Sequence, residues 1–244
     1  MKRIFVALML VMATLAVSAQ GAATTPVADP PKVISTPKTD MLASFNRVKI
    51  DGQIVVVFKK VATANEARIT YDTKGNETSK FKFDIDKKGL LTISEKSDPK
   101  RLTVTEVTIY YYALSEAKIA HAKVSFNGVV KSDIFDLFVS GGATVSLNVS
   151  TLDIAIECTG ASRLTLGGST KYLTMRASTA KIDCSTLSTV SATVEASHSA
   201  EVRLSIKERL EAKTSTGAKL LYKGKPVILR NHNVIFGGEI LNVN

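Results

Sequence analysis

The residues of this sequence that could carry out chemistry are few and lie far apart in the chain. Its histidines, His121, His198 and His232, fall in separate copies of a repeat, so they do not predict a shared metal site. The nearest approach to a Gly-x-Ser-x-Gly nucleophile motif is the segment 167–171, Gly-Gly-Ser-Thr-Lys, which is typical of a turn. The sequence therefore predicts no metal, no cofactor and no hydrolase motif.

Paired carboxylates deserve the same test, because glycoside cleavage needs two of them flanking one groove. Glu157 and Glu195 take the same place in two copies of the repeat, but two copies apart, which is roughly 10 Å by strand spacing. No carboxylate cluster of the kind that binds Ca²⁺ in a lyase is evident. Four other carboxylates share no place in the repeat: Asp133, Asp136, Asp153 and Asp183. We therefore predict that the protein is not an enzyme.

Two cysteines, Cys158 and Cys184, could form a disulfide in an oxidising compartment. They fall at different places of the repeat, which favours two small buried hydrophobic side chains instead. The sequence alone leaves their pairing open.

A repeat of about twenty residues is evident from Ile119 onward. Each of its seven copies contains a similar six-residue motif, which we call a phrase. The fourth place is always small: Ala122, Ala143, Ser162, Ala180, Ala200, Ala218 and Gly238. The sixth place is always aliphatic: Val124, Val145, Leu164, Ile182, Val202, Leu220 and Ile240. The place between them is polar: Lys123, Thr144, Arg163, Lys181, Glu201, Lys219 and Glu239.

One copy of this repeat is too short to bury its own apolar face, so the copies must stack and join those faces into continuous columns. The pattern predicts an all-β fold, a right-handed parallel β-helix-like solenoid of about seven coils, with the sixth-place residues as its structural core. The second half of each coil offers further inward candidates, among them Leu152, Val227 and Leu229.

The polar fifth place predicts a ligand-binding wall. Stacking would align Lys123, Arg163, Lys181 and Lys219, and a partly basic wall suits an extended acidic ligand. The chain carries a formal net charge of +10, but its charges are spread along the sequence and do not interleave with aromatic residues. We therefore expect a glycan or an extracellular matrix polymer as partner, and not a nucleic acid.

The N-terminal residues predict export. Lys2 and Arg3, an apolar run over 4–17 and the small residues up to Ala19 form a cleavable signal peptide over 1–19. A flexible Pro/Thr-rich linker follows over 20–41, an N-terminal β region over 42–115 and the solenoid over 116–244, with 42–244 as one structural unit. No later segment is long and apolar enough for a transmembrane helix, so we expect the periplasm, the outer membrane or the cell surface.

Several phrases together resemble a known family. They are the opening 45–52, the strand 90–93 after a glycine, the run 107–114, the phrases 140–142, 159–162 and 215–218, and the ending Tyr222-Lys-Gly224-Lys-Pro226-Val227. In order and number they are similar to the auto-transporter adhesin head domain, or GIN-type domain, of Gram-negative bacteria, over about residues 45 to 240. The resemblance implies a right-handed β-helix-like fold and an envelope or surface location. Independently of it, open coils expose strand edges, so we expect the 42–115 region to pack in line with the solenoid as its cap.

These observations favour a non-enzymatic cell-envelope adhesin that binds an extended or repetitive ligand. Two alternatives stay open at this point. One is a periplasmic structural or assembly protein whose coils pair edge to edge into homo-oligomers, and the other is a polysaccharide-active β-helix enzyme.

Overall fold

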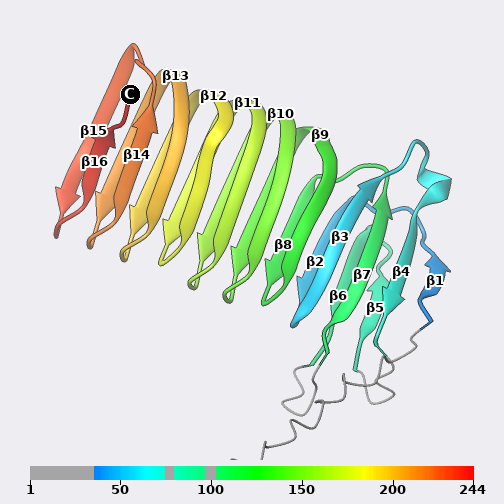
Figure 1. Cartoon of the computed structure of the whole chain (residues 1–244). Coiled ribbons are helices and arrows are strands. Elements are labelled where there is room, and N and C mark those ends of the chain that lie inside the picture. The colour runs from blue at the N-terminus through cyan, green and yellow to red at the C-terminus, as the bar shows by residue number, and fades with distance from the viewer. Residues whose placement is uncertain (1–35, 75–79, 97–102) are drawn as a thin grey trace, which may run out of the picture. The chain divides into compact units, whose positions relative to one another are not determined.

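The alternating runs of the sequence form strands that stack along one axis in the computed structural model (Figure 1). The structure describes residues 36–74, 80–96 and 103–244, so the predicted signal peptide and most of the predicted linker lie outside the described residues. Within these ranges, no helix is long and apolar enough to cross a membrane.

The N-terminal elements are short. They are β1 (Lys38–Met41), β2 (Arg47–Asp51), β3 (Ile54–Lys60), the 3-10 helix η1 (Ala64–Glu66), β4 (Arg68–Asp72), β5 (Lys82–Ile85), β6 (Leu90–Ser94), β7 (Thr105–Tyr111) and β8 (Glu116–Ala120). The repeats then form β9 (Lys123–Ser140), β10 (Thr144–Thr159), β11 (Arg163–Ser178), β12 (Lys181–Ser197), β13 (Glu201–Ser215), β14 (Lys219–Lys223), β15 (Ile228–Ile235) and β16 (Glu239–Asn242).

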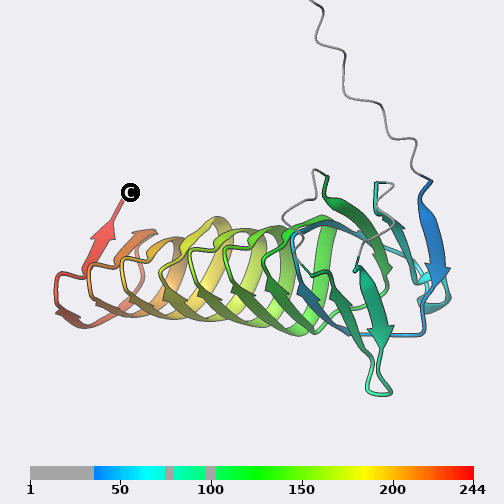
Figure 2. The ribbon, with the colours of Figure 1, turned by 90° about the horizontal axis from the view of Figure 1, so that it is seen from below.

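The repeats form a β-solenoid, as the sequence predicted. Strands β9 to β13 each wind through a full coil and pair in parallel with the coil before and the coil after (Figure 2). Equivalent places of the repeat are register partners, for example Val145 with Val124 and with Leu164. The solenoid has about six turns and not seven, because the last phrase contributes only the short strand β16.

The small and aliphatic places of the repeat line the interior. Every small fourth-place residue is buried, from Ala122 to Gly238. The sixth-place residues from Val124 to Leu220 are at most 3% exposed, whereas Ile240 in the last strand is half-buried because no coil covers it. The inward columns therefore run the length of the solenoid and supply most of its hydrophobic stabilisation.

Ser162 is the polar member of the small fourth-place column. Its Oγ atom is buried and has no hydrogen-bond partner among the described residues, while most other coils carry alanine here. A buried hydroxyl without a partner costs about 1–3 kcal/mol. We therefore expect Ser162→Ala to raise the free energy of unfolding by about 1 kcal/mol, measured by urea denaturation. A drop in stability would mean that this hydroxyl has a partner, and Ser146→Ala, on the exposed surface, is the control.

The 42–115 region does pack in line with the solenoid, but in an order that the sequence did not predict. Strand β2 pairs in parallel with both β8 and β6, and β3 pairs in parallel with both β9 and β7. The coil formed by β2 and β3 therefore lies between the β6–β7 coil and the first repeat coil. Solenoid stacking thus begins before residue 116, and the predicted domain boundary at that residue has no counterpart in the sheet.

Antiparallel strands close the N-terminal end. β4 pairs with β7, β1 pairs with β4, and β5 pairs with β6, all antiparallel, which ends the parallel stacking. The rings of Tyr71, Phe81 and Phe83 lie between β4 and β5, with Tyr71 and Phe81 centroids 4.9 Å apart. The cap includes β1, so the segment 20–41 ends in a paired strand and is not linker throughout.

The last coil ends in polar residues that bond to the coil before it. Asn242 takes the register place of a column that is inward and apolar in the coils before it, but it is exposed, and its Nδ2 donates to the carbonyl of Gly224 at 3.1 Å. The Gly224 N–H donates in turn to Asn244 Oδ1 at 2.8 Å. Three inward predictions near coil corners and in this last coil are wrong, because Leu152, Val227 and Leu229 are 50%, 88% and 43% exposed.

Candidate functional site

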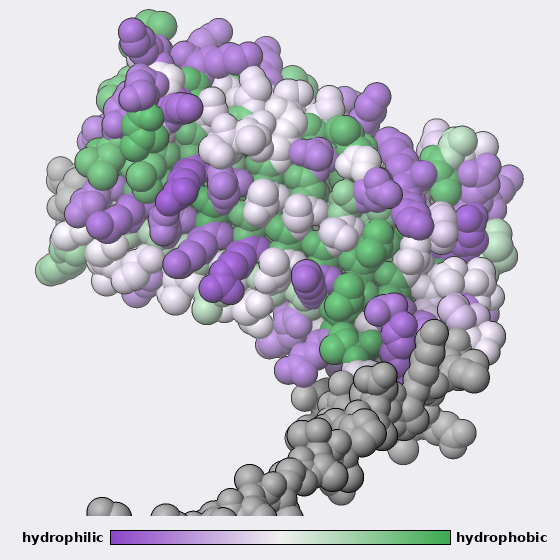
Figure 3. Space-filling model, viewed as in Figure 1, coloured by the Kyte–Doolittle hydropathy of each residue, from purple (hydrophilic) through white to green (hydrophobic). Residues whose placement is uncertain are grey.

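The coils present two long walls on either side of a ridge of tight turns. We call the first half of each coil, such as 144–150, the first wall, and the second half, such as 153–159, the second wall. The ridge between them consists of turn residues with positive φ, among them Gly141, Ala161, Thr179, His198 and Thr216. Outward side chains of each wall form rows along the solenoid axis, with the spacing of about 4.8 Å between paired strands. Figure 3 shows hydrophilic side chains interspersed with neutral and hydrophobic ones across one face.

The predicted basic residues do share one row of the first wall, but they do not form a continuous basic stripe. Thr144 lies between Lys123 and Arg163, and Glu201 lies between Lys181 and Lys219. The Nζ atom of Lys219 also pairs with Glu239 at 3.2 Å. Only Arg163 and Lys181 are direct neighbours in the row.

Arg163 and Lys181 are the feature of the first wall that could bind a ligand. Both side chains are exposed, and neither forms an ion pair with a described residue. Both line two hollows, one of about 300 Å³ on the first wall and one of about 220 Å³ against the ridge. Two neighbouring cations that form no ion pair with a described residue attract an anion that can reach both of them.

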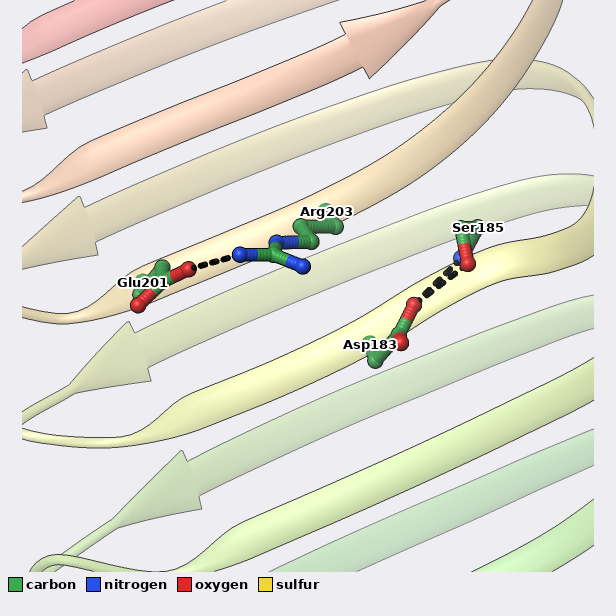
Figure 4. A network of polar contacts seen from close by, with 4 residues as sticks. All are labelled: Asp183, Ser185, Glu201 and Arg203. Carbon is green, nitrogen blue, oxygen red and sulfur yellow. Dashed lines mark hydrogen bonds and ion pairs between the residues drawn. The ribbon is translucent and has the colours of Figure 1, made fainter.

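The other charged groups of the larger hollow already have partners (Figure 4). Arg203 donates to Glu201 at 2.8 Å. The carboxylate of Asp183 accepts from the side chain and backbone N–H of Ser185 at 2.6 and 3.0 Å. These bonds, together with the nearby Arg203, lower the pKa of Asp183. Arg203 and Glu201 offset each other, and Asp183 keeps its negative charge, so Arg163 and Lys181 together leave the hollow with a net positive charge.

The second wall carries a different arrangement that the sequence only partly indicated. Glu157, Arg176, Glu195 and Lys213 are successive register partners, so charges alternate in sign along the axis. They line a hollow of about 360 Å³ between this row and the ridge. A row of hydroxyl residues lines the same hollow: Thr159, Ser178, Ser197 and Ser215.

Glu157 and Glu195 thus do line one hollow, two coils apart as the spacing predicted. The intervening Arg176 lies between them and pairs with Glu195 at 3.4 Å. The sequence did not predict that Arg176 would join this row. Arg176 lies one residue before the six-residue motif of its coil, whereas Glu157 and Glu195 each lie two residues before the motif of theirs. Lys213 also lies two residues before the motif of its coil, so its place in the row could be predicted from the sequence.

Cysteine and histidine do not form a reactive centre. Both cysteines are free thiols in the interior, and burial raises the pKa of Cys158 to about 12 and raises that of Cys184 as well. A thiol with so high a pKa is protonated near neutral pH and is a poor nucleophile. His121 Nδ1 lies 2.9 Å from Asp51 Oδ1, at the turn next to β2. Among the described residues, no three of His, Cys, Asp and Glu are grouped as metal ligands.

Comparison with known families gives one match over most of the chain. The family model described as "Putative auto-transporter adhesin, head GIN domain" matches residues 44–226. No curated protein matches the sequence.

Solved structures share the fold. A putative adhesin from Bacteroides fragilis aligns with a TM-score of 0.78 at 14% identity, over 86% of this chain and 97% of the other. A putative adhesin from Parabacteroides merdae aligns with a TM-score of 0.69 at 18% identity, over 86% and 96%. A protein from Parabacteroides distasonis described as a putative lipid binding protein aligns with a TM-score of 0.66 at 15% identity, over 86% and 97%.

Proposed function

Because this chain belongs to the family described as putative auto-transporter adhesin, head GIN domain, we propose that it is an exported, non-catalytic adhesin of the cell envelope. Its ligand is an extended acidic polymer, a glycan or matrix component, that lies along the first wall. The observation that carries this proposal is the pair Arg163 and Lys181, two exposed neighbouring cations without an ion pair among the described residues.

The geometry suits a polymer better than a small anion. The hollows at Arg163 and Lys181 are each lined by residues of three successive coils. A repetitive ligand can meet the same backbone geometry at every coil, while its acidic groups bind the two cations. Cleavage of the proposed signal peptide removes Lys2 and Arg3, so the exported chain carries a net charge of +8 (10 minus 2), which adds a long-range attraction for such a polymer.

Replacing both cations should weaken binding to an acidic polymer. We expect Arg163→Gln/Lys181→Gln to reduce affinity for polygalacturonate oligomers on the order of 100-fold, since two charge-assisted hydrogen bonds of about 1.5 kcal/mol each amount to about 3 kcal/mol. The measurement is biolayer interferometry with immobilised protein, with neutral dextran as the reference polymer. Raising the salt concentration should weaken the wild-type interaction, because exposed charges are screened.

The matched control is Lys131→Gln/Lys207→Gln, which removes the same net charge from two exposed lysines that line neither hollow. If both double variants bind equally, the attraction is due to overall charge and the proposed site is wrong. Binding that does not depend on salt would also contradict an acidic ligand.

The location can be tested on producing cells. Proteinase added to intact cells should remove the protein if it faces outward, while a periplasmic marker survives. Protection until the outer membrane is opened would rule out adhesion at the cell surface and would favour a periplasmic structural protein instead.

A further inference from the structure

The hollow on the second wall has no role in the proposed binding of an acidic polymer, and its chemistry is different. Its charged row has the order Glu157, Arg176, Glu195, Lys213, one residue from each of four successive coils. The two middle residues, Arg176 and Glu195, form an ion pair with each other. The carboxylate of Glu157 and the ammonium group of Lys213, at the two ends of the row, have no such partner among the described residues.

Glu157 and Lys213 are both exposed, and neither forms an ion pair with a described residue. They are three coils apart, which corresponds to roughly 14 Å along the axis. A ligand that satisfies both must carry a cationic group and an anionic group separated by about that length. A purely anionic polymer would meet Lys213 favourably but would be repelled by Glu157.

The row of hydroxyl residues indicates what chemical groups the middle of such a ligand carries. Thr159, Ser178 and Ser197 are successive register partners, so each coil places one hydroxyl at the hollow. The Oγ atoms of Ser178 and Ser197 also lie 3.3 and 3.1 Å from His198 Nδ1, and each hydroxyl keeps further hydrogen-bonding capacity for a ligand. A hydroxyl can donate and accept at once, which suits the hydroxyls of a sugar ring. The coil spacing of about 4.8 Å is close to the advance of one sugar ring in an extended chain. The charged row also repeats every two coils, as the charges of a polymer with a two-sugar repeat would.

We infer that the hollow from Glu157 to Lys213 on the second wall is a binding site for an extended glycan that carries both amino and carboxylate groups. The amino group binds Glu157, the carboxylate binds Lys213, and the ring hydroxyls between them bind the hydroxyl row. This site is separate from Arg163 and Lys181. The inference rests on the proposed function in one respect, namely that the ligand is a glycan.

The test uses oligosaccharides that share one β-1,4-linked backbone and differ in charge. Carboxymethyl chitosan carries both groups, chitosan carries only amines, and carboxymethyl cellulose carries only carboxylates. Binding is measured at mildly acidic pH and low salt in the Arg163→Gln/Lys181→Gln background, so that the first wall no longer contributes. We expect carboxymethyl chitosan to bind at least tenfold more tightly than either of the other two.

Two substitutions locate the site. Glu157→Gln and Lys213→Gln should each reduce binding of carboxymethyl chitosan about tenfold. Glu208→Gln and Lys207→Gln, the same changes at exposed residues outside the hollow, should leave it unchanged. Thermal unfolding followed by circular dichroism checks that each variant is folded.

Equal binding of the three oligosaccharides, or unchanged binding in both hollow variants, would overturn the inference. Neither result would bear on the first wall. The binding of polygalacturonate to Arg163 and Lys181 is tested in a separate experiment, in which Glu157 and Lys213 are unchanged. The failure of one site is therefore distinguishable from the failure of the other.

Discussion

Val202→Asp should abolish cooperative folding of the solenoid. Val202 is fully buried, with Ile182 and Leu220 as its register partners in the coils on either side. A carboxylate there has no cation or hydrogen-bond donor aimed at it and must either lose its hydration or become protonated. The expected cost exceeds about 4 kcal/mol, a large part of the 5–15 kcal/mol that stabilises an ordinary domain.

The effect should extend beyond one residue, because each coil is stabilised mainly by its two neighbours. Breaking the column at Val202 separates the coils on either side of it. Circular dichroism during urea denaturation should show a broad, non-cooperative loss of β structure. The control Lys207→Asp introduces the same carboxylate at an exposed position of the same strand. A urea denaturation curve like that of the wild type would contradict the inward position of Val202.

The second large effect is expected from Gly168→Ala. Gly168 has a φ of +103°, and a Cβ atom there would lie 2.0 Å from the carbonyl oxygen of Val149, its register partner in the preceding coil. The obstacle is backbone, so relief requires that two paired strands move apart. Together with the strain of a positive φ, this should destabilise the protein on the order of 3–5 kcal/mol.

Gly128→Ala is a matched control for this substitution. Gly128 has a φ of +105°, nearly the same as Gly168, but a Cβ atom there would meet nothing within 4 Å. It should therefore cost only the strain of the backbone conformation, about 1–3 kcal/mol. Equal losses of stability in the two variants, measured by urea denaturation, would show that the close approach to Val149 is not important.

The stacking of the repeats could be predicted because it follows from local periodicity. Alternating side chains define one inward face, and only stacking can bury that face in coils of about twenty residues. The free thiols illustrate the same point, because each cysteine replaces an aliphatic residue of an inward column, such as Leu204 next to Cys184. The place of a residue within the repeat was thus enough to predict, for most residues, whether the side chain is buried.

The order of the N-terminal coils could not be predicted in this way. Strands β2 and β3 have the same alternation as β6 and β7, so either pair could lie next to the first repeat coil. In the structure β6 and β7 are the pair that lies next to the antiparallel strands β5 and β4, where Tyr71 packs against Phe81 and Phe83. These are contacts between residues on different strands that no local pattern reveals.

The amino-acid sequence by itself determined the fold class, the inward columns and the polar row that includes Arg163 and Lys181, because these depend on side-chain alternation along one strand. The tertiary structure alone decided which charged residues become neighbours. A one-residue shift in register moved Arg176 between two carboxylates and left Glu157 and Lys213 without ion pairs among the described residues. Charge pairing depends on distances of a few ångströms between coils, and those distances are set only when the coils have stacked.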